Sequence, residues 1–294
     1  MHIRDVGELI LLSVLWGAAY LFMRSAVPAF GPAPLIALRL AIAAAVLLPV
    51  LMWRGGIGQL GAHPVALVVQ AVPFTALPFL MLGFAAQHLT AGLMAVLNAT
   101  APLFAALLAH FVFHDRLGLW RSAGLVVGFG GVAWLTAGSV SFKSNQGLLA
   151  VGAVLLTSAL WALGANYTRR RLGGMNSLAL TVGSLAVAGL ALAPLATSTW
   201  PATPPSTRAW TEMAFLGVCS SGLGFLLYYR LLRRIGPVRA MSVTFLNPVV
   251  ALAAGALYLG EALDWQTLAG AAVVLAGTAL ALGLWPATAS SHGS

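Results

Sequence analysis

The sequence predicts an all-α polytopic membrane protein in which ten transmembrane helices form two inverted five-helix repeats. Three observations lead to this fold class. Hydrophobic residues make up 60% of the 294 positions and charged residues only 7%, too few charges to cover a soluble protein of this length. A pattern of prolines, acids and glycines occurs twice along the chain. Basic residues gather in alternate loops between the apolar runs.

Membrane topology explains the positive charge of the chain. The formal net charge is +9 and the sequence pI is about 11.1. In a soluble protein this excess would suggest nucleic-acid binding, but no basic stripe is interleaved with exposed aromatics, so we expect no nucleic acid as a partner. Cys219 is the only cysteine, which excludes an intrachain disulfide. No metal-ligand spacing, nucleophile–base pair or phosphate loop is visible, so we expect no cofactor and no enzyme activity.

The ten spans follow from the length of the apolar runs, because a helix crosses the bilayer in about 20 residues. The predicted spans are 6–25, 33–53, 64–86, 90–112, 118–138, 147–168, 176–197, 210–232, 237–258 and 264–285. Pro73 and Pro78 interrupt the third span. Membrane helices tolerate proline where neighbouring groups satisfy the freed carbonyls, so the span is retained.

Each half of the chain carries the same landmarks. At an offset of 146 residues the pairs are Pro102 and Pro248, Asp115 and Glu261, Gly124 and Gly270, and Gly131 and Gly277. Nearer the N-terminus the offset is 145, and the pairs are Ser13 and Ser158, Trp16 and Trp161, and Pro49 and Pro194. We expect a first repeat at 1–142, a second at 143–286 and a disordered tail at 287–294. Because each repeat has an odd number of spans, the two lie in opposite orientations.

The basic residues orient the chain in the membrane. With the N-terminus inside, the cytoplasmic loops hold Arg4, Arg54, Arg116, Arg121, Arg169, Arg170, Arg171, Arg230, Arg233, Arg234 and Arg239. The outer loops hold only Arg24, Lys143 and Arg208. By the positive-inside rule both termini are cytoplasmic, in a bacterial inner (plasma) membrane. The lipid bilayer is therefore an expected partner, and a monomer is compatible with the sequence.

Aromatic residues in mid-span are the first candidates for a binding site. Trp16 and Tyr20 are four residues apart and share one helix face. Tryptophan prefers the membrane interface, so Trp16 and its repeat partner Trp161 are unusual at this depth. They either pack between helices or line a cavity, where an indole could face an ammonium group.

Arg39 lies about six residues inside the second span, deeper than an interfacial charge. It lies about 9 Å from the outer end of the second span at 1.5 Å per residue. A charge at this depth usually faces a cavity or a partner, so Arg39 could hold a substrate carboxylate. The alternative is that its side chain reaches back to the outer surface or caps the carbonyls of a broken helix.

Polar residues elsewhere in the spans complete the predicted site. Asn98 and Thr244 each stand four residues before a repeated proline, where the helix could break near mid-membrane. The alternative for each is an interhelical hydrogen bond. The matching third and eighth spans carry polar residues in both repeats, which favours a polar lining. Tyr228 lies near the inner end of the eighth span. The remaining candidates for substrate binding are Gln70, Thr75, Phe79, Ser221 and Tyr228.

The order and spacing of several short motifs resemble the EamA family of the drug/metabolite transporter superfamily. The motifs are the run Leu246-Asn247-Pro248-Val249-Val250-Ala251, Gly260-Glu261, Gln266 with Gly270, Thr100-Ala101-Pro102-Leu103, Asp115 with Gly124, Trp16-Gly17 and Arg39. The resemblance covers essentially the whole chain in two copies. It implies a ten-span exporter of amino acids and other small metabolites. The aromatic-rich lining resembles the YddG-like exporters of aromatic and other neutral amino acids.

One departure bears on energy coupling. Related four-span multidrug pumps carry a glutamate embedded in their first helix, whereas the acids here are expected at or beyond the span ends; they are Asp5, Glu8, Asp115, Glu212, Glu261 and Asp264. We therefore expect export of neutral and aromatic amino acids by alternating access, without obligatory proton coupling. Export of drugs or nucleotide-type solutes is the alternative within transport. A membrane-embedded lipid-modifying enzyme and a scaffold without transport activity are the alternatives from other classes.

Overall fold

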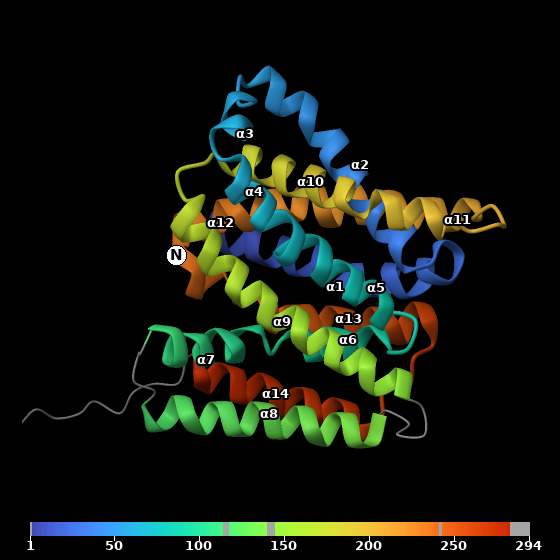
Figure 1. Cartoon of the computed structure of the whole chain (residues 1–294). Coiled ribbons are helices and arrows are strands. Elements are labelled where there is room, and N and C mark those ends of the chain that lie inside the picture. Colours follow the sequence, from blue (N-terminus) through green and yellow to red (C-terminus); the bar gives the residue numbers. More distant parts are fainter. Residues whose placement is uncertain (1, 114–117, 140–144, 241–242, 283–294) are drawn as a thin grey trace, which may run out of the picture.

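The computed structural model describes residues 2–113, 118–139, 145–240 and 243–282, and helices fill most of these ranges (Figure 1). The first repeat contains α1 (Ile3–Phe30), α2 (Pro32–Trp53), α3 (Gly58–Ala62), α4 (Pro64–Ala71), η1 (Val72–Ala76), α5 (Leu77–Ala85), α6 (Ala91–Asn98), α7 (Ala101–Phe113) and α8 (Leu119–Ser139). The second contains α9 (Asn145–Arg171), α10 (Ser177–Ser198), α11 (Thr207–Ala214), η2 (Phe215–Leu223), α12 (Gly224–Ala240), α13 (Val243–Leu259) and α14 (Trp265–Ala281).

The ten predicted spans correspond one to one to helical segments. Within the described ranges, seven helices are long and apolar enough to cross a membrane. They are α1, α2, the continuous Pro64–Ala85, the pair α6 and α7, α9, α10 and the continuous Thr207–Gly236. The other three segments are α8, with 21 residues, and the shorter apolar α13 and α14. The protein is therefore an all-α polytopic membrane protein. The predicted repeat boundary at 142 and the tail at 287–294 lie outside the described residues.

The first helix is longer than its predicted span. The prediction began the first span at residue 6 and ended it at 25, whereas α1 runs from Ile3 to Phe30. A single residue, Gly31, separates α1 from α2. Its φ of 76° and ψ of 163° lie in a region that only glycine adopts without strain. The outer connection of this hairpin is therefore very short, which hydropathy alone does not reveal.

Of the two possible helix breaks, the one in the fourth span is present, whereas the ninth span continues through its proline. Helix α6 ends at Asn98 and α7 begins at Ala101, so the chain is interrupted near mid-span. In contrast, Pro248 lies inside α13, which continues through it. Close packing supports that proline-containing turn, because a Cβ at Gly17 of α1 would meet the Val250 Cβ at 2.5 Å. Neighbouring helices can support a proline inside a membrane helix in this way.

Two π-helical segments occupy repeat-related positions. Segment η1 lies in the middle of the third span, and η2 lies in the middle of the eighth. Such segments are rare, and they occur frequently at functional sites because they leave backbone carbonyls without their usual helical donors. Pro73, inside η1, has no N–H to donate to the turn before it. Segment η1 contributes Phe74 to the cavity described below, whereas η2 packs against α1 and α2 of the first repeat.

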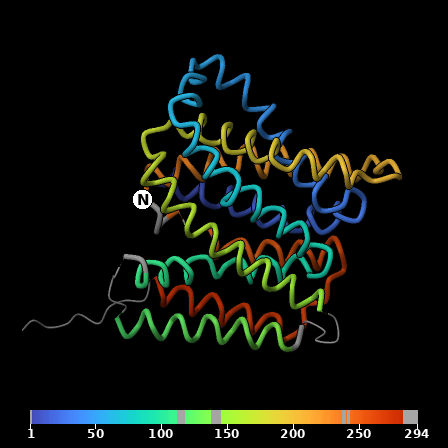
Figure 2. Tube along the Cα trace, viewed as in Figure 1, coloured from blue at the N-terminus to red at the C-terminus, as the bar shows by residue number. Residues whose placement is uncertain are grey.

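The contacts between the two repeats follow an approximate two-fold symmetry, so that each helix of one repeat packs as its counterpart in the other repeat does (Figure 1). The second helices α2 and α10 pack against each other, and so do the fifth helices α8 and α14. Helix α1 packs on α13, and its counterpart α9 packs on α6 and α7. Helix α9 also packs on α5, and α1 packs on α12. The trace in Figure 2 shows α8 and α14 running together along one edge of the bundle.

Glycines allow α8 and α14 to approach closely. A Cβ at Gly277 would collide with the backbone of Gly128, and one at Gly124 would collide with the backbone at Ala281. At Gly131 an added Cβ would lie 2.8 Å from the Val273 side chain. Small residues at these positions let two membrane helices pack backbone to backbone.

Polar contacts fasten both ends of α1 to the eighth span. Near the start of α1, Glu8 forms ion pairs with Arg230 at 3.5 Å and with Arg234 of α12. Near the other end of α1, the Ser25 hydroxyl donates to the Glu212 carboxylate of α11 at 2.7 Å. Because the contacts lie at opposite ends, α1 and the eighth span are held together as one unit.

Candidate functional site

A cavity lies between the two repeats, with an empty volume of about 960 Å³ that includes its open side. Its lining comes from α1, α2, α4, η1, α5, α6, α7, α9, α12 and α13, so both repeats contribute. Most of the surface is aromatic or aliphatic, and a few polar groups interrupt it.

Arg39 is the only charged residue in the described lining of this cavity. Its side chain is 2% exposed, so it does not reach back to the outer surface. Nε donates to the Ser221 hydroxyl at 2.6 Å, and Nη2 donates to the Ser220 hydroxyl at 2.9 Å. The guanidinium lies 4.5 Å from the centre of the Phe79 ring. All these partners are neutral, so the positive charge is oriented but not neutralised by them.

A polar chain crosses the cavity wall at mid-membrane. The Asn98 side-chain amide donates to the Tyr20 hydroxyl at 2.7 Å. The Ser158 hydroxyl of α9 lies 3.2 Å from the Asn98 side-chain carbonyl, which can accept from it. The contact between Asn98 and Tyr20 joins α6 to α1. Asn98 therefore forms interhelical hydrogen bonds and also lines the cavity, so both sequence readings hold at this residue.

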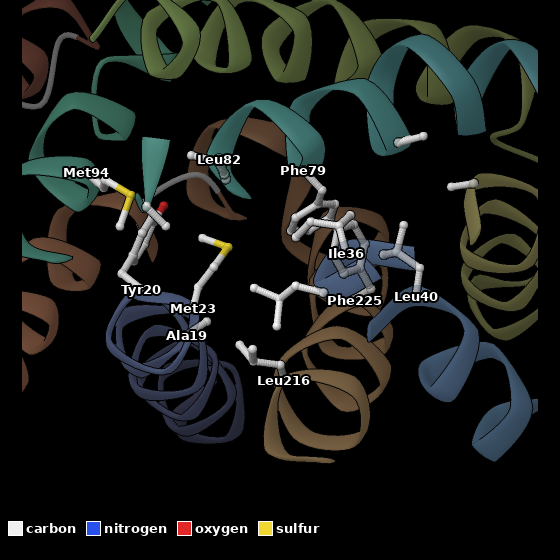
Figure 3. Packing of buried hydrophobic residues seen from close by; sticks show 14 of the residues in the cluster. Ala19, Tyr20, Met23, Ile36, Leu40, Phe79, Leu82, Met94, Leu216 and Phe225 are labelled. Carbon is white, nitrogen blue, oxygen red and sulfur yellow. The ribbon is translucent and has the colours of Figure 1, made fainter. Parts of the chain in front are cut away.

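Aromatic rings make up two facing walls. On one wall, Trp16 contacts Phe225 and Tyr228, with ring centroids 5.6 and 5.3 Å apart. On the other, Phe79 contacts Trp161 at 5.7 Å. Phe79 also meets Phe225 at 5.8 Å, and Figure 3 shows both rings beside Ile36. These separations suit tilted and edge-to-face aromatic pairs. The Trp16 indole N–H donates to the Ser220 carbonyl in η2 at 3.1 Å, so Trp16 offers the cavity its ring and not its donor.

Most of the predicted site residues converge on this cavity. Those in the lining are Trp16, Tyr20, Arg39, Gln70, Phe79, Asn98, Trp161, Tyr228 and Thr244. Thr75 and Ser221 are buried beside it and are not part of the lining. The Thr75 hydroxyl donates to the Gln70 carbonyl at 3.3 Å, which supports the η1 turn. Ser221 orients Arg39, as described above, so the structure gives it a supporting position.

Sequence reasoning missed several lining residues. Phe225 is the repeat partner of Phe79, so the repeat itself was a usable signal. Tyr229 and Asn247 adjoin residues already noted, but neither has a pattern that would separate it from helix packing. Phe74 and Thr168 line the cavity as well, and no sequence signal identified either residue.

The two ends of the cavity differ in burial. At the end near Arg39, Met23, Phe79 and Leu82 are 1 to 3% exposed and close the space. Figure 3 shows Met23 and Tyr20 projecting from α1 toward this region. Toward the ends of α9 and α12 that carry the arginine clusters, the lining includes the half-buried Leu232 and Thr244. The lining is therefore less tightly buried toward the arginine-rich ends than at the end near Arg39.

The Glu261 carboxylate lies at the closed end of the bundle and bridges the two repeats. Its two oxygens accept from the Ala91 amide of α6 at 3.0 and 3.1 Å. An acid at a helix N-terminus satisfies a free amide and complements the helix dipole. This contact links the connection between α13 and α14 to the start of the fourth span. Among the described residues, no group of acids, histidines and cysteines has the geometry of a metal site.

The sequence matches the EamA-like transporter family twice, over residues 8–137 and 148–283. Among similar proteins, a WAT1-related chloroplast protein of Arabidopsis thaliana is 29% identical over 88% of this chain. The chain spans 65% of that protein's length.

With two bacterial proteins, the similarity extends over most of both chains. The uncharacterized inner membrane transporter YedA of Escherichia coli K12 is 28% identical over 89% of this chain and 86% of its own length. A probable terminal-alkyne amino-acid exporter of Streptantibioticus cattleyicolor is 25% identical over 94% of this chain and 93% of its own length. A solved crystal structure superposes with a TM-score of 0.69 over 97% of this chain and 98% of that one, at 19% identity.

Proposed function

The chain belongs to the EamA-like transporter family, and we propose that it exports neutral and aromatic amino acids across a bacterial inner membrane through the cavity between its repeats. The observation that carries this proposal is the buried Arg39 guanidinium, surrounded by aromatic walls and by neutral partners only. One similar protein is named as a probable amino-acid exporter, and another as an inner membrane transporter.

Arg39 binds the substrate carboxylate on this proposal. A guanidinium presents several donors in a planar fork that matches a carboxylate. The Ser220 and Ser221 hydroxyls fix the direction of that fork before substrate arrives. A buried cation without an acid is costly for the empty protein, and a bound carboxylate relieves this cost. The site is therefore set up for an anion of single charge.

The aromatic walls bind the rest of the substrate. Trp16 and Trp161 present ring faces to an ammonium group or to an apolar side chain. The Tyr20 hydroxyl accepts from Asn98 and keeps its own proton to donate. A zwitterion with an aromatic side chain meets each of these features. Nucleotide-type solutes carry several negative charges, and one guanidinium does not balance them.

Transport proceeds by alternating access between the two repeats. On this proposal the cavity opens toward the less tightly buried, arginine-rich ends of α9 and α12, which the positive-inside rule places in the cytoplasm together with both termini. The structure then represents an inward-facing state with a sealed outer end. Exchanging the roles of the two repeats about their approximate two-fold axis gives the outward-facing state.

Obligatory proton coupling is not part of the proposed mechanism. The described lining of the cavity contains no aspartate, glutamate or histidine. We therefore propose that solute gradients alone drive net export. Carboxylates in the described residues lie near the helix ends, where arginine or a backbone amide holds them.

Counterflow into proteoliposomes tests the transport function. Purified protein is reconstituted with unlabelled phenylalanine or tyrosine inside, and labelled amino acid is offered outside. Transient accumulation above the level of protein-free vesicles is expected. Failure of both amino acids, in protein that remains monodisperse and folded, contradicts the proposed substrate class.

Cysteine labelling tests the orientation in cells. With Cys219 replaced by serine, Asn145→Cys is expected to react with an impermeant reagent from outside, because the start of α9 then faces the periplasm. Gly173→Cys, at the other end of α9, is expected to be protected until the cells are opened. The reverse pattern would show that the termini lie on the outer side.

A further inference from the structure

Two buried polar atoms on the cavity wall have no hydrogen-bond partner. They are Oε1 of Gln70 on α4 and Oγ1 of Thr168 on α9. The side chains are 5% and 4% exposed, and both line the cavity. Tyr229 approaches Gln70 from α12, yet the Gln70 carbonyl oxygen remains without a donor. Unsatisfied buried acceptors are uncommon in native proteins, and each calls for an explanation.

The two atoms lie on neighbouring turns of the same wall. One turn away, a Cβ at Gly164 of α9 would meet the Phe74 Cβ at 2.7 Å. Helices α4 and α9 cross the membrane in opposite directions under the predicted topology. One helical turn further in the same membrane direction, α9 presents Thr168, four residues after Gly164. On the third span the same step leads to Gln70, four residues before Phe74. These side chains therefore form one polar pole, distinct from the pole at Arg39.

The repeat relates the two poles to each other. At the offset of 145 residues, Met23 corresponds to Thr168 and Arg39 corresponds to Ser184. Met23 accompanies Arg39, with its sulfur 3.8 Å from Nη1. Ser184 is also buried and approaches Tyr229, but it lies outside the lining. Inversion thus places a neutral polar pole at the inner depth that mirrors the cationic pole at the outer depth.

The distance between the poles suits a particular ligand. From Gln70 to Phe79, over which Arg39 lies, the wall rises at most about 13 Å at 1.5 Å per residue, because the π-helical η1 between them rises less per residue. Subtracting two hydrogen bonds of about 2.8 Å leaves at most roughly 8 Å for the ligand. An extended amino acid with a para-hydroxyphenyl side chain has about this length between its carboxylate and its phenol oxygen. Aromatic walls fill the interval between the poles.

On the basis of the proposed function, we infer that Gln70 and Thr168 form a specificity subsite for a hydrogen-bond donor at the far end of an aromatic amino acid, so that tyrosine is preferred over phenylalanine. The phenol O–H donates to the Gln70 carbonyl oxygen and lies against the Thr168 hydroxyl. Phenylalanine leaves both protein groups unpaired in a dry site, and a site built to bind a hydroxyl rejects an analogue that lacks it.

Transport and binding of three ligands test this subsite. L-tyrosine, L-phenylalanine and O-methyl-L-tyrosine are compared, because the methyl ether retains the oxygen but has no proton to donate. In the unmodified protein, half-saturation for tyrosine is expected at a concentration about tenfold lower than for either other ligand. Thr168→Val and Gln70→Met keep the side-chain size and remove the polar atoms. Each variant is expected to raise the half-saturation concentration for tyrosine about tenfold. The value for phenylalanine is expected to stay the same or to fall.

A control and a second readout separate this role from a structural one. Thr181→Val also removes a buried hydroxyl, but that hydroxyl donates within its own helix to the Ser177 carbonyl at 2.7 Å and does not line the cavity. It is expected to leave the ratio of tyrosine to phenylalanine unchanged. Removing an unsatisfied atom is expected to raise or preserve the melting temperature of the ligand-free protein for Thr168→Val.

The outcomes distinguish the subsite from the transport function. If the unmodified protein binds and transports tyrosine and phenylalanine with equal half-saturation, the proposed subsite is wrong, but the proposed amino-acid export is not contradicted. An equal loss of both substrates in Thr168→Val, with a lowered melting temperature, also overturns it. If neither amino acid is bound or transported by the unmodified protein, both the proposed function and the subsite are wrong.

Discussion

Replacement of Arg39 by glutamine is the most informative perturbation, because binding and stability are expected to respond in opposite directions. Arg39 donates two hydrogen bonds to hydroxyls and lies over Phe79. A hydrogen bond between charged groups contributes about 1.5 to 3 kcal/mol. Loss of the ion pair with a substrate carboxylate is therefore expected to cost roughly 2 to 3 kcal/mol, or roughly 30- to 140-fold in affinity.

The empty protein is expected to respond differently. Removing a buried cation that no acid compensates eliminates a desolvation cost, so Arg39→Gln should melt at the same temperature or higher. Arg39→Lys keeps a charge but loses the planar fork and the stacked contact, and it should bind with intermediate affinity. Arg54→Gln is the matched control, because Arg54 follows the same helix and is exposed. Its affinity should equal that of the unmodified protein.

The assay compares tyrosine with tyramine, which lacks the carboxylate. The unmodified protein should discriminate strongly between them, and Arg39→Gln should lose most of that discrimination. Two measurements report this discrimination: the shift of the melting temperature that each ligand causes, and the rate of counterflow with each ligand. The carboxylate assignment is refuted if folded Arg39→Gln still discriminates as the unmodified protein does. A lowered melting temperature of the empty variant would contradict the expected relief of desolvation instead.

Three further predictions concern the outer seal, the helix interface and energy coupling. Glu261→Ala should lower the free energy of unfolding by about 1 kcal/mol, because the Ala91 amide loses its cap; an unchanged denaturation midpoint would show that the contact contributes nothing. Gly277→Ala should destabilise by about 1 to 3 kcal/mol through overpacking against Gly128, whereas Gly130→Ala, with open space around it, should not. An imposed pH gradient should produce no concentrative amino-acid uptake in proteoliposomes, and accumulation that a protonophore abolishes would establish proton coupling instead.

The sequence predicted the membrane spans because hydropathy and the repeat are both strong linear signals. A run of about 20 apolar residues has few alternatives to a membrane helix. The pairs Pro102 with Pro248 and Gly131 with Gly277 then set the register between the halves. The same signals left open whether Pro248 breaks its helix, because a proline's effect on a membrane helix depends on the neighbour that packs against it. Here that neighbour is Gly17, more than 200 residues away in the sequence.

The site was only partly predictable for a related reason. Helices that are apolar all round carry little information about which face borders a cavity. Unusual residues such as Arg39 and Trp161 were visible because they are costly or rare in mid-span. Phe74 and Thr168 resemble ordinary helix residues and acquire their positions only from the crossing of α4 and α9. The π-helical turns also have no reliable sequence pattern, yet η2 supplies the carbonyl and the hydroxyls that hold Trp16 and Arg39.

The charged pole at Arg39 and the neutral pole at Gln70 and Thr168 lie at opposite depths of the cavity. The inward-facing and outward-facing states are therefore expected to bind substrate with different affinity. In the inward-facing state Arg39 lies at the closed end, where a pair of unit charges 4 Å apart interacts by up to about 4 kcal/mol; in water this falls to about 1 kcal/mol. Exchange of the repeats opens the Arg39 pole to the outside, so water then competes for the carboxylate. The equilibrium across the membrane is unaffected, but half-saturation for efflux should lie at least about tenfold below that for influx. Vesicles of known protein orientation measure both, and equal values would show that Arg39 does not become hydrated on the outer side.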